Sequence, residues 1–215
     1  YMIMSRPRME NPLERIRGFK REMYKPADSE FGYWYRYKGK IMNQNARRVI
    51  RVTPTITGVT YGNNDILFDT TEIPLAVGKS GECSKLVSAM IISKSNSVFD
   101  AEIFFCQVNQ TMGTVNAARN VSDADFATAK VMGTLTLDGS ADDYNYGGGR
   151  IFRFDRNQEG FAETAGDDLA KSRFPILLQA ASGTTSVYCF AFLAGTDVTP
   201  DFSVGDLELV LGVEY

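Results

Sequence analysis

From residue 47 onward, short apolar segments alternate with runs rich in Gly, Ser, Asn and Asp. Apolar and polar positions alternate within most of these segments, which is typical of strands with one buried face. Nine strands are predicted in this way, over residues 49–56, 65–68, 86–93, 101–108, 131–137, 150–154, 175–180, 186–194 and 207–213. Many short strands joined by polar loops predict an all-β fold, specifically a jelly-roll-like β-sandwich.

Local signals refine this pattern. The turn at Asn96 and Ser97 predicts that strands 86–93 and 101–108 form a hairpin. Pro54 lacks a backbone donor, so the first strand is expected at an edge or to be broken there. One helix of one to two turns is predicted after Ser122, because this residue can cap the helix and acids follow in the first turn.

The chain is expected to consist of an extended arm over residues 1–46 and a β-sandwich domain over residues 47–215. Within the arm, Asn11 and Pro12 are typical of a helix start, and apolar residues follow at roughly helical spacing. Lys25-Pro26 is expected to end that helix, because a proline disfavours the helical conformation of the residue before it.

Basic and aromatic side chains gather in the arm, and these are the candidate binding residues. They are Arg15, Arg17, Phe19, Arg21, Tyr33, Trp34, Tyr35, Arg36 and Tyr37. Such residues can anchor an arm on a partner subunit, stack on bases or sugars, or pack against their own domain. Acids interrupt the basic residues, so nucleic acid is the less expected partner.

Charge is distributed unevenly along the chain. Residues 1–51 hold 13 Lys and Arg against 5 Asp and Glu, a formal charge of +8. The remaining residues hold 10 basic and 21 acidic side chains, a charge of −11. This asymmetry indicates association through complementary charge and says nothing about the fold.

The chain contains no histidine. Catalysis by Ser-His-Asp or Cys-His groups therefore has no base, and His-ligated zinc or haem has no ligand. No pair of carboxylates can be singled out for glycoside hydrolysis among the 26 acids. We expect a protein that is not an enzyme.

No cofactor or metal site is predicted from the loops. Gly147-Gly148-Gly149-Arg150 leads into a strand, whereas a phosphate-binding loop leads into a helix. The acidic run 138–143 lacks the alternating acids and terminal Glu of an EF-hand. Both segments are interpreted as ordinary turns.

Three cysteines do not make a disulfide framework. Cys106 and Cys189 lie in apolar strands and are expected to be buried thiols, whereas Cys83 lies in a polar turn. No apolar run approaches the ~18–20 residues of a membrane span, so no membrane association is expected, and no signal peptide is recognised.

An ordered series of segments across residues 60–215 resembles a class of small virion proteins of tailed bacteriophages. The segments are 65–74 (DILFDTTEIP), 84–93 (SKLVSAMIIS), 99–105 (FDAEIFF), 113–125 (GTVNAARNVSDAD), 131–135 (VMGTL), 182–188 (SGTTSVY) and 205–212 (GDLELVLG). The resemblance implies a β-sandwich structural protein of the particle, with no catalytic residues. The arm is not part of this resemblance.

The resemblance and the charge distribution together lead to one expectation about function. We expect a decoration, or cement, protein of the capsid, located in the virion after assembly in the host bacterial cytoplasm. Its expected partners are the major capsid protein, other virion proteins and further copies of itself, with a trimer compatible. The alternatives are a tail, neck or fibre-attachment protein, a carbohydrate-binding β-sandwich that stacks sugars on Trp34 and its neighbours, and a coat protein whose arm meets the genome.

Overall fold

A computed structural model describes residues 46–140, 143–154, 174–194 and 199–215, together with the backbone of three short strands nearer the N-terminus. The chain divides into two compact units, Tyr1–Asn45 and Ala46–Tyr215. In the first unit, β1 (Met23–Tyr24), β2 (Trp34–Tyr37) and β3 (Lys40–Met42) form an antiparallel sheet in that order.

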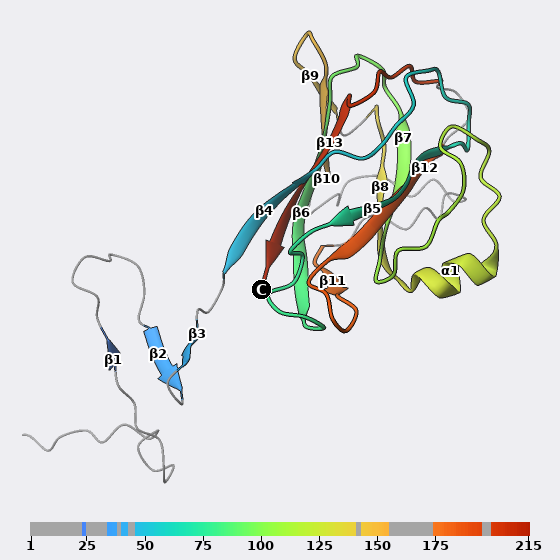
Figure 1. The fold of residues 1–215 in the computed structure, drawn as a ribbon. Coiled ribbons are helices and arrows are strands. Elements are labelled where there is room, and N and C mark those ends of the chain that lie inside the picture. Colours follow the sequence, from blue (N-terminus) through green and yellow to red (C-terminus); the bar gives the residue numbers. More distant parts are fainter. Residues whose placement is uncertain are drawn as a thin grey trace, which may run out of the picture. The chain divides into compact units, whose positions relative to one another are not determined.

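The second unit contains two antiparallel sheets, which lie on opposite sides of the body in Figure 1. The six-stranded sheet has the order β4 (Arg47–Val52), β13 (Leu207–Glu214), β6 (Cys83–Ser93), β10 (Arg150–Phe154) and β9 (Asp143–Asn145), and β11 (Ile176–Gln179) also pairs with β6. The four-stranded sheet has the order β5 (Ile66–Ile73), β12 (Val187–Ala194), β7 (Asp100–Cys106) and β8 (Val131–Leu137). The predicted all-β sandwich is confirmed.

The strand pairing is that of a jelly roll. The first strand of the body pairs with the last, β4 with β13, and the next pairs inward are β5 with β12, β6 with β10 and β11, and β7 with β8. This nested order, closed by β13 on β6 and β12 on β7, produces two sheets from one folded-over ribbon. The body has ten strands rather than nine, because β9 was not predicted.

The predicted hairpin between strands 86–93 and 101–108 is wrong. β6 lies in the six-stranded sheet and β7 in the four-stranded sheet, so the chain crosses from one sheet to the other between them. Phe99 lies in this connection, and its side chain is fully buried between the sheets. The burial of this large apolar side chain favours the crossing over a hairpin turn at the surface. The first strand is an edge strand as predicted, and it ends at Val52, before Pro54.

The main core fills the space between the two sheets. Leu207, Leu209 and Leu211 of β13 exemplify it, since alternate residues point inward and are almost completely buried. At one end of this core, the ring of Phe99 lies edge-on to Phe152 at 4.8 Å and to Phe202 at 5.2 Å between centroids. Edge-to-face contact is a favoured geometry for aromatic rings, so this trio packs the β6–β7 connection and the loop before β13 against β10.

The single helix predicted after Ser122 is confirmed as α1 (Asp123–Ala129). Ser122 and Asp125 form a capping box, which satisfies backbone donors at the helix start. α1 covers the outer face of the four-stranded sheet, where Phe126 packs among Phe104, Phe190 and Phe192 in a second apolar cluster. The outer side of this sheet is therefore closed by the chain itself.

Candidate partner-binding surface

The candidate arm residues have little described structure. Arg15, Arg17, Phe19, Arg21 and Tyr33 lie outside the described residues, and so does the expected arm helix up to residue 22. The prediction that this helix continues to Lys25 is wrong, because Met23 and Tyr24 form β1 and pair with β2. Trp34, Tyr35, Arg36 and Tyr37 make up β2, whose backbone is paired on both sides. Tyr35 of β2 lies opposite Met23 of β1 on one side and opposite Met42 of β3 on the other. The aromatic run is thus a strand of a small sheet.

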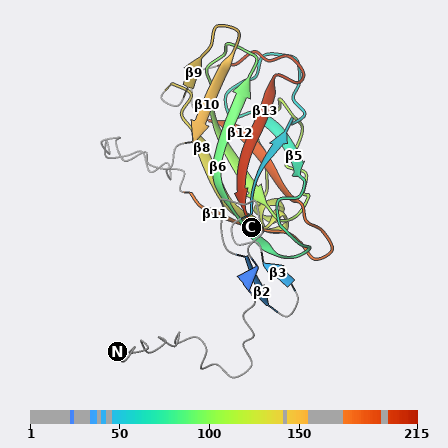
Figure 2. The ribbon, with the colours of Figure 1, turned by 90° about the vertical axis from the view of Figure 1, so that its left-hand side faces the viewer.

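The outer face of the six-stranded sheet has a row of apolar residues that crosses three strands, β6, β10 and β9. Ile92 of β6 lies beside Ile151 of β10, which lies beside Tyr144 of β9. Tyr144 is 61% exposed, and both isoleucines are half-buried. On the other side, Ile92 lies opposite Glu208 of β13. No described element crosses this face, which is turned to the viewer in Figure 2.

A second row runs parallel to the first, two residues along each strand. Its members are Arg51, Val210, Met90 and Arg153, in register across β4, β13, β6 and β10. Val210 belongs to neither internal cluster and is nevertheless only 7% exposed, because it lies between its neighbours on the sheet surface. We call the surface formed by Met90, Ile92, Tyr144, Ile151 and Val210 the apolar face.

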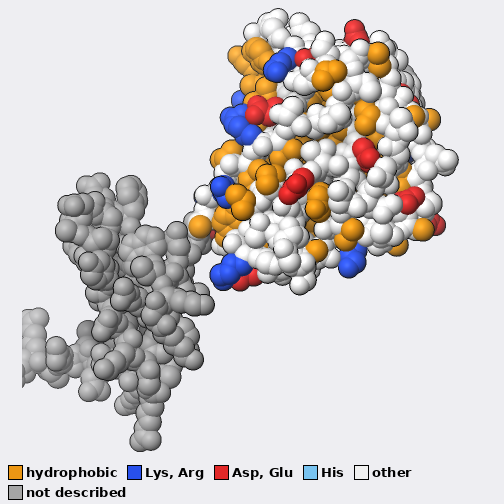
Figure 3. Space-filling view, viewed as in Figure 1, with side chains coloured by type: hydrophobic (Ala, Val, Ile, Leu, Met, Phe, Trp, Pro, Cys, Tyr) orange, Lys and Arg blue, Asp and Glu red, His pale blue; other side chains and the backbone are white. Residues whose placement is uncertain are grey.

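Charged side chains border the apolar face. Arg51 pairs with Glu208 at 3.0 Å, and Arg47 pairs with Glu214 at 3.6 Å. Lys85 and Arg153 are exposed on the same side of the sheet and have no ion pair among the described residues. Figure 3 shows Lys and Arg side chains along this margin of the body with apolar ones between them. The border therefore has more positive than negative charge.

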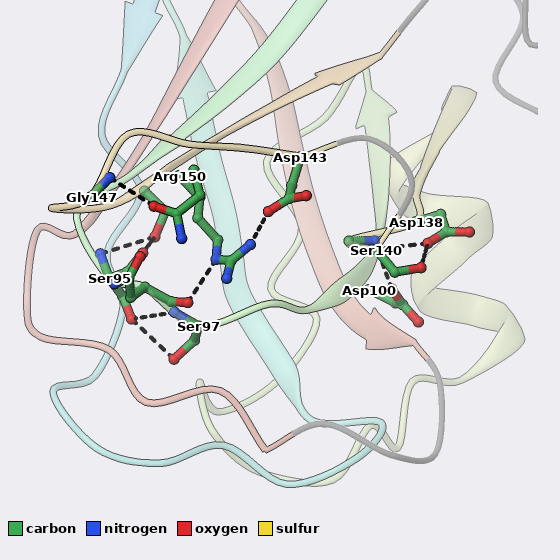
Figure 4. Close-up of polar contacts among 12 residues, drawn as sticks. Ser95, Ser97, Asp100, Asp138, Ser140, Asp143, Gly147 and Arg150 are labelled. Atoms are coloured by element: carbon green, nitrogen blue, oxygen red, sulfur yellow. Dashed lines mark hydrogen bonds and ion pairs between the residues drawn. The ribbon is translucent and has the colours of Figure 1, made fainter.

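The hairpin of β9 and β10 is fixed to the rest of the body by polar contacts (Figure 4). The guanidinium of Arg150 forms an ion pair with Asp143, and its Nε donates to the carbonyl of Asn96 at 2.7 Å. The hydroxyl of Tyr146 donates to the carbonyl of Ser93 at 3.1 Å. These contacts hold the hairpin against the connection between β6 and β7 and so position Tyr144 on the apolar face.

The Gly-rich loop 147–149 allows the hairpin to lie close to the end of β6. A Cβ atom on Gly149 would lie 2.2 Å from the carbonyl oxygen of Ser93, so only glycine fits there. The loop leads into β10, as the interpretation of an ordinary turn requires.

In the acidic run, Asp138 accepts two hydrogen bonds from Ser140, one from its amide and one from its hydroxyl. Among the described residues, no three side chains of the metal-binding types lie close enough to hold an ion.

Cys106 and Cys189 are buried as predicted, whereas Cys83, predicted in a turn, is the first residue of a strand. Cys106 in β7 and Cys189 in β12 are buried on adjacent strands, and Cys83 is exposed at the start of β6. Burial raises the pKa of the Cys106 thiol to about 12, and it raises the pKa of Cys189 further. Both buried groups are therefore neutral thiols near pH 7 and poor nucleophiles.

A sequence signal for the apolar face exists and was missed. Ala89-Met90-Ile91-Ile92 is apolar without interruption, so both faces of β6 are apolar at this point. Such a run is typical of a strand covered on both sides. The other members of the face are identified only by the strand register, because only pairing shows that Tyr144 and Ile151 lie in the same row.

No helix among the described residues is both long and apolar enough to cross a membrane.

Comparison with known proteins identified no relative. No family model matches the sequence, and no curated protein matches it. Among solved structures, a chain from "Structure of infectious bursal disease virus Gt strain" aligns with 89% of this chain at 11% identity and a TM-score of 0.18. The alignment covers 49% of that viral chain, so the present chain spans about half of its length.

Proposed function

We propose that the protein is a non-enzymatic structural protein of a tailed-bacteriophage virion, and that it decorates and stabilises the capsid. The observation that carries this proposal is the apolar face, which the body leaves open on one sheet while α1 covers the other. An apolar centre with a polar rim is the usual arrangement of a protein–protein interface. The resemblance to small virion proteins points to the particle as the place of that interaction.

Two attachment points on one chain suit a role on a lattice. The segment 1–45 contains 10 basic and five acidic residues, and it is joined directly to the body at Ala46. When two weak contacts are linked, the second forms at high effective concentration and the overall affinity rises. Repetition over many copies then reinforces the shell without demanding a tight single contact.

The proposal is tested by counting copies on purified particles. Quantitative mass spectrometry against the major capsid protein should give tens to hundreds of copies, in a fixed ratio to that protein. About three to twelve copies would place the chain in the tail or neck instead and overturn the decoration role. Absence from particles would overturn both, and retention on polysaccharide resins that is lost in Trp34→Ala would then support sugar binding.

A further inference from the structure

We infer that the apolar face is the surface through which the body docks, and that its partner is an acidic, partly apolar surface of another protein in the particle. The inference rests on the proposed function and deepens it, because it names the docking side of the body and the chemistry of the partner. Its evidence lies in the extent of the face, its free charges and its continuity with the N-terminal segment.

The size of the face fits the centre of an interface. The apolar row of Ile92, Ile151 and Tyr144 crosses three strands and spans about 10 Å, because neighbouring strands lie about 4.8 Å apart, and the two rows are separated by about 7 Å. Such a patch has an area on the order of 100–200 Å², whereas a specific interface buries about 800 Å² on each partner. Interfaces have an apolar centre and a polar rim, so the charged border must contribute the remaining contacts.

The charges of the border select an acidic partner. Both acids on this side of the sheet, Glu208 and Glu214, already pair with arginines of β4. Lys85 lies opposite Glu214 in the strand register, but neither Lys85 nor Arg153 forms an ion pair among the described residues. Two such faces would repel each other, so a second copy docked face to face is disfavoured. Carboxylates on a partner would complement both cations.

Continuity with the N-terminal segment points the same way. β4 is the edge strand of this sheet and begins at Arg47, two residues after Asn45, the last residue of the basic segment. The segment has a formal charge of +5, the same sign as the border of the face. An acidic partner would therefore attract the N-terminal segment as well as the border of the face.

A protein partner fits this face better than nucleic acid does. Aliphatic side chains occupy its centre, where a phosphate backbone would find no donor. The carboxylates of Glu208 and Glu214 would repel phosphates along the β13 side. Nucleic-acid readers combine a basic groove with aromatic platforms, and the face has only Tyr144 of that kind.

The experiment measures binding to shells of the same phage assembled without this protein, by co-sedimentation. Two double variants alter the face. The first is Lys85→Glu/Arg153→Glu, and the second is Ile92→Thr/Ile151→Thr, which keeps the β-branched shape of both side chains. The controls are Lys79→Glu, exposed in the loop before β6, and Val59→Thr, exposed in the loop before β5. We expect both face variants to bind at least tenfold more weakly, and both controls to bind within twofold of the wild type.

A second readout uses the wild-type protein and so does not depend on how a variant folds. Acetylation of Lys85 should slow several-fold in shell-bound protein, while acetylation of Lys79 should not change. If the wild type binds and the face variants bind equally well, or if Lys85 stays as reactive as before, the inference is overturned and the proposed function survives. If the wild type does not bind, both fail. Binding to duplex DNA that the Lys85→Glu/Arg153→Glu variant loses would overturn the protein partner in favour of nucleic acid.

Discussion

The ion pair between Arg150 and Asp143 should contribute measurably to stability, unlike most surface pairs. The two side chains are only 17% and 19% exposed, so water screens them less than it screens an exposed pair. Arg150 also donates to the carbonyl of Asn96 at 2.7 Å. It thus connects β9 and the β6–β7 connection to the start of β10.

The magnitude follows from these two contacts. A hydrogen bond to a charged group contributes about 1.5–3 kcal/mol, and removal of one partner leaves the other without compensation. Arg150→Met keeps the aliphatic stem and loses both contacts, so we expect the free energy of unfolding to fall by about 3 kcal/mol. Asp143→Asn loses one charge and should cost about 1–2 kcal/mol. If the pair interacts as drawn, the double variant should cost little more than Arg150→Met alone, a coupling of about 1–2 kcal/mol.

Urea denaturation followed by circular dichroism measures these differences, with the slope m as a check that unfolding remains cooperative. Arg153→Met is the matched control, because this arginine lies on the same strand, is exposed and has no ion pair among the described residues. It should change the free energy of unfolding by no more than about 0.5 kcal/mol. A loss below about 1 kcal/mol in Arg150→Met, or additive single variants, would refute the assigned role of the pair.

Three further predictions concern α1 and the thiols. Ser122→Ala removes the helix cap and should cost about 1 kcal/mol, with faster hydrogen exchange confined to α1. Hydrogen bonds from Ser122 hold the pKa of Asp125 below its usual value. The stabilisation that they give is complete above the unfolded-state pKa of about 4 and is lost as the pH falls through the folded-state pKa. Asp125→Asn should therefore lack this acid-dependent step in thermal unfolding. In native protein, an alkylating reagent should modify Cys83 alone, and Cys106 and Cys189 should react only on unfolding; native modification of either buried thiol would contradict their burial.

The all-β class and most strands could be predicted because alternation of apolar and polar residues is a local property. The helix could be predicted for the same reason, since Ser122 and Asp125 act within one turn. Pairing is not local. The turn at Asn96 and Ser97 looked like a hairpin turn, yet the burial of Phe99 carries the chain to the other sheet.

The candidate surface shows the same limit. Basic and aromatic residues stood out in the arm because they are close in sequence, and their binding role stays a prediction. The apolar face is assembled from strands up to about 120 residues apart, with Met90 on β6 and Val210 on β13. Only strand register places these residues side by side, so composition and spacing could not identify the surface.

The pairing of β4 with β13 has a mechanical consequence. The two strands are antiparallel, with Arg47 opposite Glu214, and the amide of Tyr215 donates to the carbonyl of Ala46 at 3.0 Å. A force that pulls residue 46 away from residue 215 therefore loads these hydrogen bonds one after another, as in opening a zipper, and little force should separate the strands. A passenger fused after Tyr215 would emerge beside the start of β4. A load on that passenger would peel β13 from β4 while α1, on the other sheet, bears none of it.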